Sequence, residues 1–164
     1  MNEIDFFSAE YSSKGLSAPF FGIIEKQPAC VTTNGDQKDW NAVVENPERL
    51  KLSFVPLDHQ IVIHTTPETT YSLCDCMLYR EAHWLALVEL KDQAKGWLED
   101  AIGQLKSTIK LIRENPKTSE YALREAYAAN RQHPAFRHSA KSRMNEFRNE
   151  TKFRLIITNR IKAK

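Results

Sequence analysis

The sequence predicts a mixed α/β (α+β) domain, in which a central mixed sheet is flanked by helices. Between residues 50 and 91, short apolar runs alternate with turn residues, as strands do. Residues 95–113 instead repeat their apolar side chains at spacings of three and four, as an amphipathic helix does. The chain has 164 residues, 41% of them hydrophobic and 27% charged, which suits one domain with its own core.

Four strands are expected in the first part of this core. They cover "LKLSFV" (50–55), "QIVIHT" (60–65), "TYSLCDCML" (70–78) and "HWLALVELK" (83–91). The short connection between the last two predicts a β-hairpin. A closing strand is expected at "KFRLIITNR" (152–160).

Helices are expected at three places. A short helix is predicted over "DQKDWNAVVEN" (36–46), and a long one over 95–113 that ends before Pro116. A third is predicted over "HSAKSRMNEFRNE" (138–150), with a basic exposed side. The segment "YALREAYAAN" (121–130) stays open between helix and strand, because its alanines favour helix by propensity alone.

The N-terminal third differs from the rest. Glycine, proline and an Asn-Gly pair break residues 1–35, which predicts irregular structure there. We therefore expect residues 1–49 to form an extension packed on a core of residues 50–164, within one globular domain overall.

Charge is unevenly distributed along the chain, although its net value is only +2. Residues 1–130 carry 13 Lys and Arg against 19 Asp and Glu, whereas residues 131–164 carry 10 against 2. Such an asymmetry predicts a nucleic-acid-binding end, and a solvated basic helix face is the alternative. The cationic candidates for phosphate contacts are Arg137, Lys141, Arg143 and Arg148.

Composition also bears on the cellular compartment. No apolar run reaches 18 residues, and the acidic N-terminus lacks the pattern of a secretory signal, so we expect no membrane association. Three cysteines are too few for a disulfide framework, which favours the cytoplasm. Neither a complete zinc ligand set nor a glycine-rich phosphate-binding loop can be found in the sequence.

Two acidic residues lie inside the apolar runs of the predicted hairpin. Side chains alternate between faces along a strand, so Asp75 and Glu89 should face the same side, opposite or diagonal to each other. Lys91 follows Glu89 by two residues and points to that same side. Cys74 and Cys76 are expected together on the other, buried face. An otherwise apolar face of the hairpin therefore carries one ionic cluster.

This cluster predicts metal-assisted chemistry. Two carboxylates so close together repel each other unless a cation lies between them. Mg²⁺ binds one or two carboxylates together with water and substrate phosphate, and it can activate a bound water for phosphodiester hydrolysis. A neighbouring lysine can orient that water or stabilise developing charge. The alternative is a structural ion pair at a strand end, but buried ion triads contribute little stability.

The pattern of one Asp, thirteen residues and Glu-x-Lys on a hairpin, followed by an amphipathic helix, resembles the PD-(D/E)xK nuclease superfamily, which has the restriction-endonuclease-like fold. The resemblance covers residues 50–160 and implies a core of helix, three strands, helix and strand. It also implies that Asp75, Glu89 and the Leu90 carbonyl bind Mg²⁺ or Mn²⁺ and that Lys91 assists catalysis. Gln104 on the following helix matches a glutamine that many members carry near the active site.

The sequence departs from the family pattern at one position, and some of its assignments have alternatives. Cys74 stands at the position of the nominal proline, and Glu10 and Asp58 are the candidates for the further acid that some members use. Gln104 fits equally well as a boundary residue that bonds to the backbone.

The resemblance implies a metal-dependent nuclease that hydrolyses phosphodiester bonds in DNA, in a setting such as defence, restriction or recombination. It would act as a homodimer or as a subunit of a larger complex. Two alternatives remain: a non-catalytic member of the same fold that binds protein or nucleic acid, and an unrelated α/β adaptor.

Overall fold

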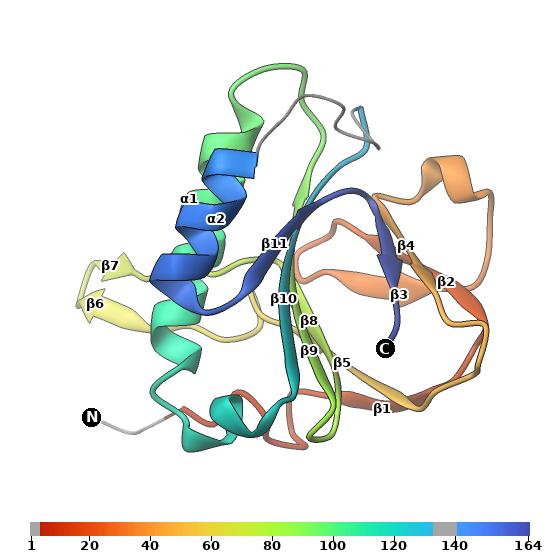
Figure 1. Ribbon diagram of the computed structural model, residues 1–164, viewed down its shortest axis with the longest axis horizontal. Coiled ribbons are helices and arrows are strands. Elements are labelled where there is room, and N and C mark those ends of the chain that lie inside the picture. The colour runs from red at the N-terminus through yellow and green to blue at the C-terminus, as the bar shows by residue number, and fades with distance from the viewer. Residues whose placement is uncertain (1–3, 133–140) are drawn as a thin grey trace.

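The computed structural model describes residues 4–132 and 141–164, and it has three layers. Figure 1 shows a large sheet in the middle, helices on one of its faces and a smaller sheet on the other. The large sheet contains β1 (Ser13–Leu16), β5 (Leu52–Pro56), β8 (Cys76–Arg80), β9 (Trp84–Lys91), β10 (Leu123–Asn130) and β11 (Arg154–Ile157). The smaller sheet contains β12 (Arg160–Lys162), β4 (Ala42–Glu45), β2 (Phe20–Ile24) and β3 (Cys30–Thr32).

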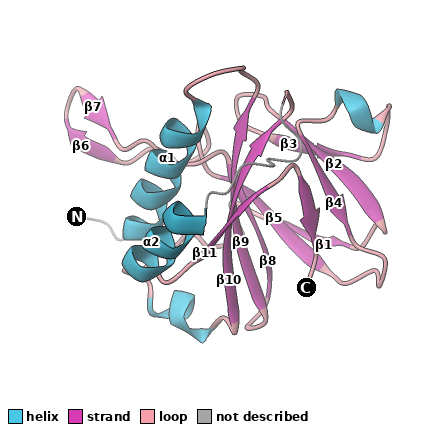
Figure 2. Ribbon diagram, turned by 45° about the horizontal axis from the view of Figure 1, so that its top comes forward, coloured by secondary structure: helices cyan, strands magenta, loops and turns pink. Residues whose placement is uncertain are grey.

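The large sheet is mixed, as the sequence predicts. Its strands follow the order β1–β5–β8–β9–β10–β11; the pairs from β1 to β9 are antiparallel, whereas β9, β10 and β11 run parallel. Parallel neighbours require a crossover, and α1 (Trp97–Ile112) makes the one between β9 and β10. The second helix, α2 (Lys141–Thr151), precedes β11 and lies beside α1 (Figure 2).

In the part of the chain that the structure describes, α1 and α2 lie on one face of this sheet and the smaller sheet covers the other. Along β8 and β9, Met77, Leu85 and Leu87 pack with α1, whereas Leu78 and Val88 pack with the smaller sheet. A strand that is buried on both faces reads as a continuous apolar run, as β9 does. The second covering layer is therefore a sheet formed largely by the N-terminal part of the chain.

The prediction of a helix over 36–46 is wrong, because this range contains a short 3₁₀ helix and a strand. Asp36 caps only a short 3₁₀ helix, η1 (Gln37–Asp39), and the chain then enters β4. The two valines of β4 are buried between β2 and β12, where β-branched side chains favour a strand.

Several other boundaries also move. The open segment 121–130 is β10, whose alanines lie buried in the centre of the sheet, where packing overrides helix propensity. A turn at Leu57 delays the strand expected at 60–65, and a small hairpin follows, made of β6 (His64–Thr66) and β7 (Thr69–Thr70). A second 3₁₀ helix, η2 (Pro116–Glu120), leads from α1 toward β10.

Both ends of the chain contribute to the body of the fold. β1 pairs with β5 at one edge of the large sheet, and β4 pairs with β12 in the smaller sheet. In the part of the chain that the structure describes, no helix has the length and apolar character needed to cross a bilayer.

Candidate active site

The hairpin of β8 and β9 brings Asp75 and Glu89 together. Its register pairs Cys76 with Val88, so one step further along the two chains Asp75 faces Glu89. Asp75 lies just before β8, and its Oδ2 accepts a hydrogen bond of 2.7 Å from the Leu90 amide. Because N–H and C=O of one strand residue point to the same side, the Leu90 carbonyl also points past the end of β8.

Glu89 is almost fully buried, with 3% of its surface exposed. Burial, a hydrogen bond with Asp75 and the charge of Asp75 together raise the pKa of Glu89 to about 11, against a smaller lowering by Lys91. Glu89 is therefore protonated at neutral pH. The proton on Glu89 allows its carboxyl group to hydrogen-bond with Asp75.

Gln104 of α1 joins the members of the site. With its amide oriented so that nitrogen faces acceptors and oxygen faces donors, the nitrogen lies 2.9 Å from Glu89 Oε2 and 3.0 Å from the Leu73 carbonyl. Its oxygen accepts from Lys91 Nζ at 3.3 Å. Gln104 thus bonds to the backbone, as a boundary residue is expected to do, and it also links Glu89 to Lys91.

One turn further along α1, Thr108 fixes the loop that carries Asp75. Its hydroxyl accepts a 2.7 Å hydrogen bond from the Cys74 amide and donates to the Gln104 carbonyl at 2.9 Å. The helix therefore holds the segment before β8 as well as contributing Gln104.

Lys91 ends β9 and is half-buried. Among the described residues, no carboxylate lies within 4 Å of its ammonium group. The side chain lines a shallow pocket of about 330 Å³ together with Ser72, Glu99, Asp100, Gly103 and Gln104. The ammonium group is thus available to a ligand that enters this pocket.

Further acids surround the carboxyl pair. The charge of Asp58 contributes to the raised pKa of Glu89, and the Asp58 amide donates to the Cys74 carbonyl at 3.2 Å. Glu25, beyond the end of β2, has a pKa raised first by burial and then by the charge of Asp75. Sequence analysis missed Glu25 because it comes from the other sheet, where no spacing relates it to the hairpin. No contact brings Glu10 to the site; its amide bonds to Ser8.

In the described part of the chain, no third His, Cys, Asp or Glu side chain completes a metal site at the carboxyl pair. Within residues 4–132 and 141–164, no three or more His, Cys, Asp and Glu side chains are placed to hold a metal ion. A metal bound by Asp75 and Glu89 would take its other ligands from main-chain carbonyl, water or substrate.

The two cysteines do not share a face, contrary to expectation. Cys74 packs in the core beneath α1, whereas Cys76 packs against the smaller sheet. β8 begins only at Cys76, so strand alternation does not extend back to Cys74. Both thiols are fully buried, and burial raises their pKa values well above the ordinary range.

The predicted phosphate-binding cations are not gathered at the carboxyl pair. Arg137 lies outside the described residues; Lys141, Arg143 and Arg148 are exposed on α2. α2 packs along the flank of α1 that carries Lys106, through an ion pair of Lys106 with Glu150. Gln104 is two residues from Lys106, about 200° around the helix axis, so it lies on the opposite flank.

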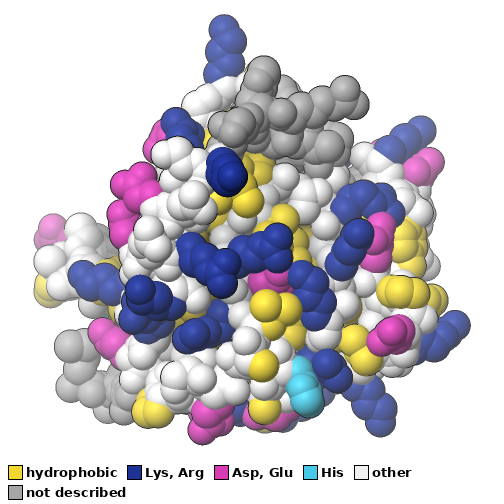
Figure 3. Space-filling view, viewed as in Figure 1, with side chains coloured by type: hydrophobic (Ala, Val, Ile, Leu, Met, Phe, Trp, Pro, Cys, Tyr) yellow, Lys and Arg dark blue, Asp and Glu magenta, His cyan; other side chains and the backbone are white. Residues whose placement is uncertain are grey.

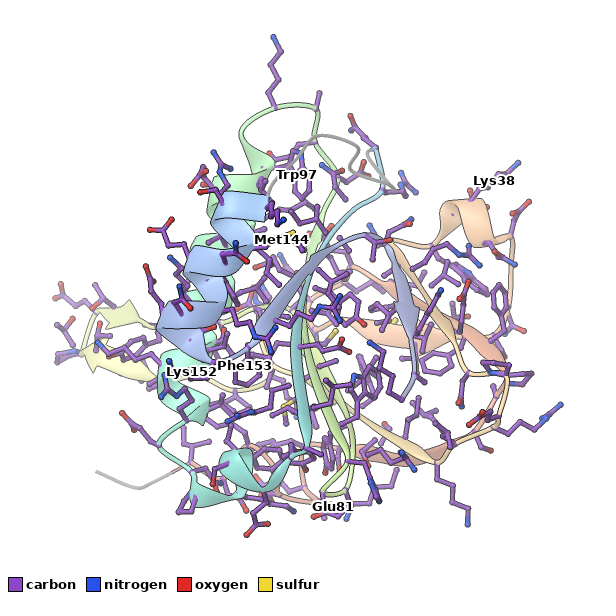
Figure 4. The ribbon with its side chains drawn as sticks, viewed as in Figure 1. Lys38, Glu81, Trp97, Met144, Lys152 and Phe153 are labelled. Carbon is purple, nitrogen blue, oxygen red and sulfur yellow. The ribbon has the colours of Figure 1, made fainter. Side chains whose placement is uncertain are left out.

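Cationic side chains nevertheless form a band across the face on which α2 and β11 lie (Figure 3). α2 is held on this face by core contacts of Met144, Phe147 and Phe153. Figure 4 shows Met144 and Phe153 at opposite ends of the helix. α2 also reaches the pocket beside Lys91, because Arg143 forms an ion pair with Glu99, which lines that pocket.

The structure therefore assembles Asp75, Glu89, Lys91 and Gln104 around one point, and Arg143 of α2 pairs with Glu99 in the wall of the adjoining pocket. Comparison with known proteins adds no relative: no family model, curated protein or solved structure matches this chain.

Proposed function

We propose that the protein is a metal-dependent nuclease that hydrolyses phosphodiester bonds, with DNA as its substrate. One observation carries the proposal: a buried glutamate faces an aspartate at the end of two strands, beside a lysine that has no carboxylate partner among the described residues. A buried glutamate beside a second carboxyl group is costly for folding, so a chain that needed only stability would gain from an apolar residue here. The cost is explained if the pair binds a cation.

The donor set suits Mg²⁺ or Mn²⁺. Asp75 and Glu89 supply two carboxylates, and the Leu90 carbonyl points to the same edge of β9. Hard divalent ions accept such oxygen ligands and complete their shell with water and substrate phosphate. When bound, the metal would polarise the phosphate and lower the pKa of a bound water.

The other side chains would act on the substrate and on the water. Lys91 would hold the attacking water or stabilise negative charge on the phosphate, since its ammonium group has no carboxylate partner among the described residues. Gln104 would keep Lys91 and Glu89 at a fixed separation through its two hydrogen bonds. Such positioning supplies much of the catalysis in phosphoryl transfer.

Topology lends further support to a PD-(D/E)xK-like core. Apart from the small β6–β7 hairpin and η2, the chain runs through β5, β8, β9, α1 and β10 as three strands, a helix and a strand. The initial helix of that core has no counterpart in the described part of the chain, where η1 is the only helical segment before β5. The smaller sheet covers the face of the large sheet against which that helix would pack.

One observation favours a second candidate, a non-catalytic binding module of the same fold. Glu99 and Asp100 line the pocket beside Lys91, and Arg143 of α2 forms an ion pair with Glu99. Acidic side chains at the mouth would repel a polyanionic backbone. In this alternative, the surface band would bind a partner and the acid pair would not hydrolyse phosphodiesters.

A cleavage assay separates the two candidates. Purified protein with Mn²⁺ or Mg²⁺ is incubated with duplex DNA, single-stranded DNA and RNA, and EDTA is added in a parallel reaction. We expect cleavage that EDTA stops and that Glu89→Ala abolishes, because the substitution removes a metal ligand. Glu125→Gln is the matched control: Glu125 is also fully buried, but its partners are Trp84, Tyr127 and Lys164. Metal binding without cleavage of any substrate would favour the binding module.

A further inference from the structure

Lys91 stands where strand pairing comes to an end. It is the last residue of β9, and residues 92–96 then leave the sheet for α1, with Gly96 in the left-handed region at φ 68°. A lysine has four rotatable side-chain bonds, so the position of its ammonium group depends on a fixed backbone. Something must therefore hold the chain just after Lys91.

Three consecutive residues at the end of β10 hold it; we call Asn130, Arg131 and Gln132 the 130–132 clamp. The Arg131 amide donates to the Lys91 carbonyl at 3.0 Å, which extends the sheet by one bond. Next to Lys91, Asp92 receives the Arg131 guanidinium at 3.0 Å and the Gln132 side-chain amide at 3.1 Å. The clamp thus turns the one carboxylate adjacent in sequence to Lys91 toward Arg131.

Asn130 provides the innermost contact of the clamp. It is fully buried, and its Nδ2 donates to the Gln93 carbonyl at 2.7 Å while its Oδ1 accepts from the Gln132 amide at 3.0 Å. The neighbouring positions in β10 are alanines, and the parallel register places Asn130 opposite Lys91. A buried amide is costly unless it is bonded, and this one bonds to the chain two residues beyond Lys91.

We propose that Asn130 is a positioning residue for Lys91: through the Gln93 carbonyl it fixes the backbone that carries the Lys91 ammonium group toward Gln104 and the Asp75–Glu89 pair. The role in catalysis rests on the proposed nuclease function. The positioning itself rests only on the contacts of the clamp.

The test compares Asn130→Ala with Asn46→Ala. Asn46 is the matched control because it is also fully buried and bonded, to Ala18 and Leu50, at the end of β4 in the smaller sheet. Should Asn130→Ala not fold, Asn130→Thr replaces it, since its hydroxyl can take over the Gln132 bond and leave the Gln93 carbonyl unbonded. Two kinds of measurement are made: kcat and KM for cleavage, and the NMR chemical shift of the isotope-labelled Lys91 Cε group, assigned with Lys91→Arg.

We expect the Asn130 variant to lower kcat roughly 10- to 100-fold with KM little changed, because misplaced catalytic groups cost rate rather than binding. The Lys91 Cε signal should move in this variant and stay in place in Asn46→Ala. An unchanged Lys91 signal with an unchanged kcat would overturn the proposal. If the parent cuts no substrate, the nuclease function fails, and the Lys91 Cε signal alone decides: movement confined to the Asn130 variant supports positioning, and no movement overturns it.

Discussion

At Glu89, burial and a neighbouring carboxyl group act in the same direction. Both raise its pKa, to about 11, so the folded protein keeps a proton that the unfolded chain loses near the ordinary value of 4.5. A carboxyl group whose pKa is raised in the folded state makes its full contribution to the free energy of unfolding at low pH, where it is protonated in both states. That contribution is lost progressively as the pH rises from about 4.5 toward 11.

Glu89→Gln should therefore stabilise the protein at pH 8. A glutamine resembles the protonated glutamate, since its amide can donate to Asp75 and accept from Gln104. We expect a gain in the free energy of unfolding on the order of 1–3 kcal/mol at pH 8 and little difference at pH 4. Urea unfolding at both pH values measures it. Equal changes at pH 4 and pH 8 would contradict the protonated state of Glu89.

Lys91→Ala should separate metal binding from catalysis. Its proposed role is in the transition state, so the Mn²⁺-induced rise in melting temperature should persist while the cleavage rate falls roughly 100-fold or more. Asp75→Ala should lose both cleavage and the Mn²⁺-induced rise in melting temperature, because Asp75 is a proposed metal ligand. A Lys91 variant that cuts as fast as the parent would remove Lys91 from the site.

Residue-scale prediction from sequence succeeded where local geometry is regular. Strand alternation and a short hairpin placed Asp75 opposite Glu89, because both lie within one step of paired residues. Cys74 was misplaced, since it precedes the strand and its position depends on Thr108 of α1. Glu25 and the 130–132 clamp come from distant segments, and no short-range pattern in the sequence relates them to Lys91.

At the scale of elements, α1 is the part that organises the site. It carries Gln104, and through Thr108 it holds the loop before β8. Its amphipathic period was visible in the sequence, but its docking contact was not. The element over 36–46 shows the opposite case: helix-compatible residues became β4 because two neighbouring strands pair with it.

Thr108→Val should weaken the docking of α1. The valine keeps the shape but leaves the buried Cys74 amide without its acceptor, which costs on the order of 1–3 kcal/mol. Chemical unfolding measures the loss, and Ser107→Ala on the same helix is the control, with an expected change under about 0.5 kcal/mol. A Thr108 variant as stable as the Ser107 variant would show that this contact does not hold the loop.

α2 is the element on which nucleic-acid binding can be tested by charge. If the exposed cations of α2 bind phosphates, replacing Lys141 and Arg148 with glutamine should reduce the slope of log affinity against log salt by about 0.7–0.9 per lost contact. Lys38→Gln is the control, since Lys38 lies on η1, at the right of Figure 4 and away from α2 at the left. Affinity that does not depend on salt, or an equal effect of Lys38→Gln, would leave the α2 cations as surface charges only.

At the scale of the whole molecule, ion pairs join the basic C-terminal segment to the more acidic part of the chain before it. In the described part of the C-terminal third, Arg131, Arg143, Arg160 and Lys164 pair with Asp92, Glu99, Glu45 and Glu125. Each pair joins the basic end to an acid of the first 130 residues. These pairs therefore engage several cations of the segment that the sequence analysis considered for nucleic-acid binding.

The most direct test of the central claim is the position of Mn²⁺ in a crystal of the protein soaked with the ion, seen by anomalous diffraction. We predict a peak between the carboxylates of Asp75 and Glu89, within reach of the Leu90 carbonyl, that disappears in Asp75→Ala crystals soaked in the same way. The absence of a peak at this pair in the parent protein, or a peak elsewhere that survives Asp75→Ala, would contradict a metal-dependent site at the end of β8 and β9.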